Sequence, residues 1–100
     1  MDLSKIKNLY EIQKKARAVQ KELKDIEIEV SSNDGWITAV FNGEQHLTGI
    51  QIDEDALRPE NKREIEKDLK NVVSQGISRA QAIAAEKMKD IAGGLGIPGM

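Results

Sequence analysis

The chain has 100 residues, of which 39% are apolar, 3% aromatic and 32% charged, and its formal net charge is −2. A chain of this length makes one domain, and so few aromatic residues leave the core to aliphatic side chains. It contains no cysteine, which excludes disulfides and thiolate metal sites. The start is too charged for a secretory signal, and no apolar run approaches the ~20 residues of a membrane span. We therefore expect a cytoplasmic protein with no membrane partner.

The charge is unevenly distributed along the chain. Residues 1–25 carry seven Lys or Arg against four Asp or Glu, residues 26–60 carry one against eight, and residues 61–100 carry seven against five. Two basic ends therefore flank an acidic middle. The negative net charge does not by itself exclude a polyanionic partner.

Residues 3 to 25 are expected to form the first helix. Six apolar residues follow one another at intervals of three and four, the spacing of a heptad seam: Leu9, Ile12, Ala16, Val19, Leu23 and Ile26. Leu3, Ile6 and Tyr10 fall on a different face. The first turns therefore either pack against something else or fray.

Three strands are expected next, over residues 26–30, 36–41 and 44–52. The first alternates apolar and acidic residues, as a half-buried strand does. Asp34-Gly35 and Asn42-Gly43 are hairpin signals, and Asn-Gly favours a tight type I′ turn. Gly49 is a candidate bulge. The pattern predicts a three-stranded antiparallel meander.

The second helix is expected to begin near Pro59, which suits a first helical turn, and to run to about Ile91. One broad apolar stripe follows it, and at ~1.5 Å per residue it would be about 48 Å long. Gly93 and Gly94 are expected to end it. The fold class is therefore α+β in the order α-β-β-β-α, with one domain over residues 1–92 and a glycine-rich mobile tail over 93–100.

Two long apolar helices cannot both be covered by one small sheet, and exposed stripes of that length are unusual on a monomer. We therefore expect a homodimer. A glycine inside a helix costs about 1 kcal/mol relative to Ala, and a close helix crossing would offset this at Gly76; the alternative is that Gly76 is merely tolerated. The candidate interface residues on this helix are Val72, Val73, Gly76, Ile77, Ala80 and Ile83.

Signals for cofactor, metal or catalytic chemistry are weak. Gly94, Gly96 and Gly99 have G-x-G-x-x-G spacing, but a dinucleotide site needs a helix after the glycines and a strand before them. Asp53 and Glu64 would be positions 1 and 12 of a calcium loop whose glycine position is Arg58. His46, the single histidine, has no companion ligands. We expect no enzyme activity, no cofactor and no metal site.

One positive feature is a basic stripe on the first helix. Its members, spaced by 7, 3, 4 and 3 residues, are Lys7, Lys14, Arg17, Lys21 and Lys24. At 100° per residue they share one face, about 160° from the heptad seam. The stripe is either a solvated helix face or a footprint for nucleic-acid phosphates, which Lys87 and Lys89 would extend. Glu11, Glu22 and Asp25 border it.

Taken together, four segments resemble the YbaB/EbfC family of bacterial nucleoid-associated proteins. They are IQKKARAVQKEL, GWITAVFNG, GIQIDEDAL and EKMKDIAGGLGIPGM, which with the chain between them cover nearly all of it. The Asn-Gly turn, the Ile-Asp pair at 52–53 and the glycine-rich end in this order are the most specific features. Ser74 and Gly76 stand where Asn and Ala are common in the family.

The resemblance implies an intertwined homodimer whose helices project like tweezers. It also implies double-stranded DNA as a partner, a place in the nucleoid, and a role in nucleoid organisation or gene regulation, without enzymatic activity. Few residues suit base reading, so we expect contacts directed mainly to phosphates. The alternative is a dimeric adaptor for recombination, repair or replication proteins, because family genes often lie beside recombination and replication genes.

Overall fold

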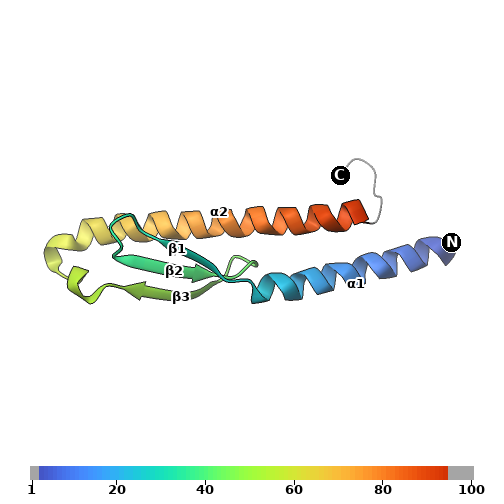
Figure 1. Cartoon of the computed structure of the whole chain (residues 1–100), viewed down its shortest axis with the longest axis horizontal. Helices are drawn as coiled ribbons and strands as arrows, with labels where there is room; N and C mark the ends of the chain where they lie inside the picture. The colour runs from blue at the N-terminus through green and yellow to red at the C-terminus, as the bar shows by residue number, and fades with distance from the viewer. Residues whose placement is uncertain (1–2, 95–100) are drawn as a thin grey trace.

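The computed structural model describes residues 3–94 and confirms the α-β-β-β-α order (Figure 1). The elements are α1 Leu3–Asp25, β1 Ile28–Ser31, β2 Ile37–Phe41, β3 Leu47–Ile52, the 3₁₀ turns η1 Glu54–Ala56 and η2 Pro59–Asn61, and α2 Lys62–Gly94. The strands form one antiparallel sheet in the order β1-β2-β3. The predicted meander is therefore confirmed.

The core lies between the sheet and the first half of α2. Alternate residues of β2 point to opposite faces, and Ile37, Ala39 and Phe41 are the buried set. Val72 and Ala80 of α2 are fully buried against them. The core is aliphatic apart from Phe41, as the composition predicts.

Gly76 faces the ring of Phe41. A Cβ atom at this position would overlap the edge of that ring, so the glycine lets α2 lie close over β2. This packing within one chain gives the glycine a reason that the sequence analysis did not consider, whether or not a helix crossing in a dimer adds to it.

The Asn42-Gly43 turn differs from the expected type I′ turn. The backbone N–H of Gln45 donates to Asn42 O, and that of Asn42 donates to His46 O. Gln45 has a positive φ of 70°, whereas the φ of Gly43 is not positive. A three-residue loop with a left-handed last position therefore replaces the two-residue turn. Gly43 is needed for a different reason, because a Cβ there would lie 2.7 Å from Leu23 O.

The predicted bulge near Gly49 is present. Val40 pairs with Gly49 and Phe41 pairs with Leu47, which leaves Thr48 as the extra residue of β3. The second helix begins at Lys62, three residues after Pro59, because Pro59–Asn61 form a 3₁₀ turn. Gly93 and Gly94 are its last two residues, so the end predicted near Ile91 is wrong by three. The rest of the expected tail, residues 95–100, lies outside the described residues.

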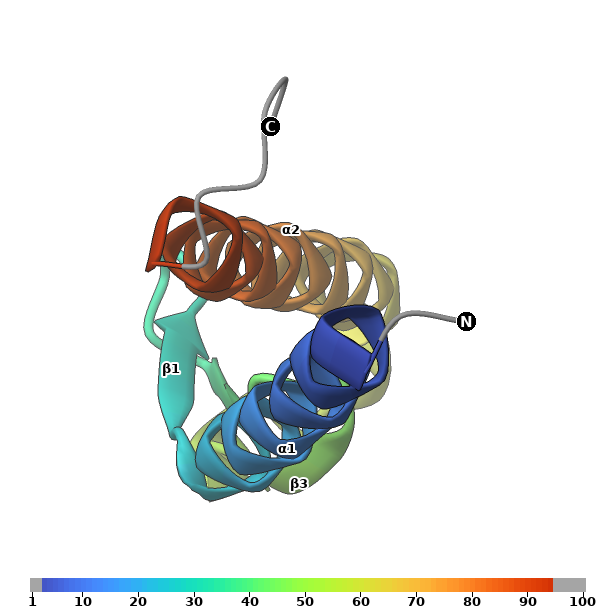
Figure 2. The ribbon, with the colours of Figure 1, turned by 90° about the vertical axis from the view of Figure 1, so that its right-hand side faces the viewer.

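The molecule is strongly elongated. Its extents are 67 × 23 × 17 Å and its radius of gyration is 19.2 Å, whereas a compact 100-residue domain has about 13 Å. α1 and α2 run antiparallel, and both project past the sheet to the same end (Figures 1 and 2). Within residues 3–94, no helix has the length and hydropathy needed to span a membrane.

Candidate functional site

The basic stripe keeps its predicted geometry. Lys7, Lys14, Arg17, Lys21 and Lys24 are all exposed on α1. Opposite them, the heptad seam becomes more buried toward the sheet, from Leu9 at 55% exposed to Leu23 at 7%. The stripe therefore lies on a helix whose seam holds it to the body of the molecule and whose outer face is free.

Lys87 and Lys89 behave differently from each other. The Lys87 ammonium lies 2.7 Å from a carboxylate oxygen of Glu22, which joins α2 to α1, and this contact raises the pKa of Lys87. Lys87 therefore neutralises one of the acids that border the stripe. Lys89 is exposed.

A shallow hollow adjoins the stripe on α1. Tyr10 and Gln13 line it together with Lys14 and Arg17. A phenol and an amide both donate hydrogen bonds to phosphate oxygens in protein–DNA contacts. Sequence reasoning placed Tyr10 on a separate face and missed this neighbourhood, although residues 10, 13, 14 and 17 have the spacing of one helical face.

The candidate dimer residues of α2 divide into two groups. Val72, Gly76 and Ala80 are buried under the sheet of the same chain, so their side chains have no surface to offer a partner. Val73, Ile77 and Ile83 are only partly buried and keep apolar surface at the edge of the core.

Strand β3 carries apolar residues that α2 leaves open. Ile50 pairs with Ala39 and Ile52 with Ile37, so both side chains face the α2 side of the sheet. α2 packs mainly on β1 and β2, and β3 lies farther from it (Figure 2). Leu47, Ile50 and Ile52 are therefore 48%, 45% and 37% exposed.

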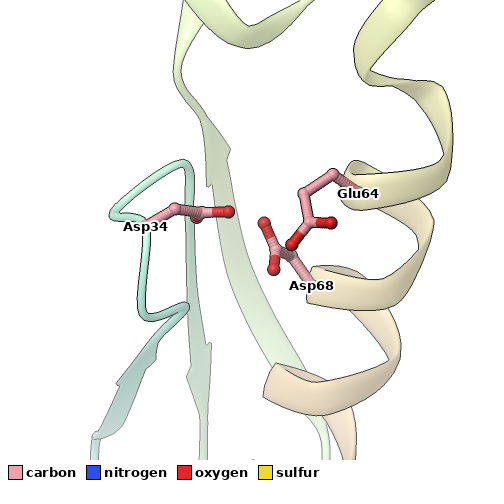
Figure 3. A group of neighbouring side chains, drawn as sticks. All are labelled: Asp34, Glu64 and Asp68. Carbon is pink, nitrogen blue, oxygen red and sulfur yellow. The ribbon is translucent and has the colours of Figure 1, made fainter.

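A second polar site lies at the opposite end of the molecule from the termini. Asp34, in the turn between β1 and β2, faces Glu64 and Asp68 of the first turns of α2 (Figure 3). One oxygen atom from each carboxylate lies within 4.8 Å of the other two. The sequence analysis considered Glu64 only as the last position of a calcium loop that begins at Asp53, and judged that loop unlikely. In the structure Asp53 instead caps η1 by accepting a hydrogen bond from Asp55 N.

The environment of Asp68 shifts its titration. The pKa of Asp68 is raised to about 6, first because its carboxyl shares a hydrogen bond with that of Asp34, and then because burial and the charges of Asp34 and Glu64 disfavour ionisation. Lys67 acts weakly in the opposite direction. The same shared hydrogen bond lowers the pKa of Asp34. The sequence could have indicated this site, because Glu64 and Asp68 are like charges at i and i+4, which destabilise a helix unless something compensates them.

The chain matches a known protein family over nearly its whole length. The model of the YbaB/EbfC DNA-binding family matches residues 2–95. The chain belongs to this family. Its membership confirms the predicted class, a non-enzymatic, nucleoid-associated DNA-binding protein.

Nucleoid-associated proteins from several bacteria are similar in sequence over nearly the full length of the chain. A nucleoid-associated protein of Syntrophobacter fumaroxidans is 33% identical over 89 residues, which cover 89% of this chain and 81% of the relative. One of Rhodopseudomonas palustris is 32% identical over 96 residues, 96% of this chain and 91% of the relative. The crystal structure of the uncharacterized protein HP0035 from Helicobacter pylori has a TM-score of 0.74 and 25% identity, covering 95% and 97% of the two chains.

Proposed function

We propose that the protein acts as a homodimer that binds double-stranded DNA mainly through its phosphates, with the α1 stripe of both subunits as the contact surface. The observation that carries this proposal is the exposure of all five basic stripe residues on one face of a projecting helix. Such a dimer would organise the nucleoid or regulate genes as a cytoplasmic, nucleoid-associated protein.

The dimer is supported by the shape and by the uncovered apolar surface. Leu47, Ile50 and Ile52 on β3 are exposed, and Val73 and Ile77 of α2 are only partly buried, so apolar surface stays uncovered within residues 3–94. Leu3, Ile6 and Leu9 near the start of α1 are also exposed. A second copy would cover such surfaces, since large exposed apolar patches mark interaction sites.

Electrostatics support a phosphate-directed contact. From Lys7 to Lys24 the stripe runs about 26 Å along α1 at ~1.5 Å per residue, so one helix can meet several phosphates. Duplex DNA carries one charge per ~1.7 Å. Residues 26–60, away from the outer end of α1, carry eight of the 17 acidic residues and a single Arg. Glu22 is neutralised by Lys87.

The test is a gel shift at 50 and 200 mM salt. If about eight phosphates are contacted by a dimer, the slope of log K against log salt should be about −7, and affinity should fall roughly 10³- to 10⁵-fold between these concentrations. A Lys14→Glu/Arg17→Glu/Lys21→Glu variant should lose binding and flatten the slope. Lys62→Glu/Arg63→Glu/Lys70→Glu makes the same charge change at the other end of the molecule and serves as the control. If both variants bind DNA equally well, the stripe does not contact DNA and is only a solvated helix face.

A protein adaptor for recombination or replication factors is the second candidate, favoured by the open apolar edge at β3. The two functions separate in one measurement. An affinity pull-down from nuclease-treated lysate is that measurement: protein partners that survive nuclease treatment favour the adaptor, and partners that are lost favour DNA binding.

A further inference from the structure

The Asp68 carboxylate is buried, and within the described part of the chain one of its two oxygen atoms has no hydrogen-bond partner. The residue is 6% exposed, and its Oδ2 atom has no hydrogen-bond partner among the described residues. The side chain points into the space between Asp34 and Glu64 (Figure 3). Since a buried unpaired charge is costly, something positive is needed there once the carboxyls are ionised.

The chain does not supply this positive charge itself. Lys67 borders the site, but among residues 3–94 no basic side chain forms an ion pair within 4.0 Å of Asp34, Glu64 or Asp68. Asp34 is fixed by the turn, because its Oδ1 accepts hydrogen bonds from Ser32 Oγ at 2.7 Å and from Trp36 N at 3.0 Å. Three carboxylates, one from the β1–β2 turn and two from α2, therefore converge without a paired basic group among residues 3–94.

We propose that Asp34, Glu64 and Asp68 bind a divalent cation, with Ca²⁺ the best fit. Oxygen ligands lie about 2.3–2.6 Å from Ca²⁺, so two on opposite sides of it are up to about 5 Å apart, whereas Mg²⁺ at ~2.1 Å draws them to about 4 Å. One oxygen of each carboxylate lies within 4.8 Å of the other two, which is inside the span of a Ca²⁺ ligand shell, and Ca²⁺ accepts less regular geometry than Mg²⁺ does.

The surroundings provide further oxygen ligands. The carboxylates border a hollow of about 150 Å³ that is also lined by Asn33, Asn71 and Gln75. Amide oxygens and water commonly complete the six to eight ligands of Ca²⁺. The bound cation would fasten the β1–β2 turn to the start of α2, at the end of the molecule away from the basic stripe, so it is independent of DNA binding.

The experiment is thermal and chemical unfolding of the full chain at neutral pH with EDTA or CaCl₂. For a weak, partly open site with a Kd of about 1 mM, 10 mM CaCl₂ should raise the folding equilibrium constant about 11-fold, and KCl at equal ionic strength should not. Calorimetric titration should give one Ca²⁺ per chain. MgCl₂ should act more weakly.

Variants locate the site. Asp68→Asn and Glu64→Gln should each abolish most of the calcium effect, and Glu64→Gln changes an exposed side chain that folding does not need. Asp53→Asn/Asp55→Asn removes two acids outside the cluster and should retain the effect. The proposal is overturned if CaCl₂ gives no stabilisation beyond KCl, which would leave a shared proton as the only occupant. It is also overturned if the effect survives in Asp68→Asn and Glu64→Gln.

Discussion

The backbone N–H of Gly43 donates a hydrogen bond of 2.7 Å to the carbonyl oxygen of Leu23. Leu23 lies in the last turn of α1, where carbonyl groups lack helical partners, and Gly43 lies in the β2–β3 turn. The turn thus caps the helix that carries the basic stripe, and the direction of α1 relative to the sheet depends on this contact.

Gly43→Ala should destabilise the protein by about 1–3 kcal/mol, the usual cost of forcing extra volume into a packed site. A Cβ there would lie 2.7 Å from Leu23 O and 2.9 Å from Leu23 Cα, and backbone cannot move aside as a side chain does. Urea unfolding at a fixed protein concentration measures this. Gly49→Ala is the control, because its Cβ would lie 3.8 Å from Val40 and should change stability by under about 0.5 kcal/mol. Equal effects of the two substitutions would contradict the close approach.

Gly76→Ala should also destabilise, although alanine gains about 1 kcal/mol of helix propensity over glycine. The reason is overlap with the Phe41 ring. Adding Phe41→Leu removes that ring edge, so the double variant should be more stable than the sum of the single effects implies. A double-mutant cycle in urea measures the coupling. Additive effects would show that Gly76 and Phe41 are independent.

If the proposed dimer forms, Ile50→Glu should convert it to a species of 11.1 kDa, because it places a charge in the exposed apolar surface of β3. Light scattering after size exclusion at micromolar concentration measures this. Gln51→Glu adds the same charge on the opposite face of the strand, where Gln51 pairs with Thr38, and should stay dimeric. A wild-type chain that is already monomeric would refute the dimer.

Lys87→Met should weaken DNA binding indirectly, by leaving Glu22 unpaired beside the stripe. Glu22→Gln/Lys87→Met removes both charges and should bind DNA as wild type does in gel shifts at 50 mM salt. If the double variant binds as weakly as Lys87→Met, Lys87 contacts DNA directly. The pair lies at the surface, where water and salt screen ion pairs, so it should contribute little to stability.

In EDTA, Asp68 should make the protein less stable as pH rises from about 4 to 6. Its folded pKa of about 6 lies above the ordinary aspartate value of 3.8, so within this window the folded state binds more protons than the unfolded state, and stability falls with pH. The lowered pKa of Asp34 acts below this window, where stability rises with pH. Asp68→Asn should therefore gain stability relative to wild type between pH 4 and 7, measured by urea unfolding, whereas Glu60→Gln should show no such trend.

The order of elements, the buried face of β1 and the basic face of α1 follow from the amino-acid sequence alone. These depend on periodicities of 2 and 3.6 residues, which are local properties of the chain. The stripe from Lys7 to Lys24 is exposed as predicted because it depends only on the geometry of one helix. Family membership likewise followed from residues read in order.

Only the tertiary structure decided which element covers which face. A heptad seam or an alternating strand shows that a side is apolar, but the partner of that side depends on how segments far apart in the chain meet. Gly43 and Gly76 are required because Leu23 and Phe41 leave no room for a Cβ atom. Asp34 meets Asp68 only because the β1–β2 turn docks on α2. The exposure of Ile50 has the same origin, since α2 packs mainly on β1 and β2 and leaves β3 open.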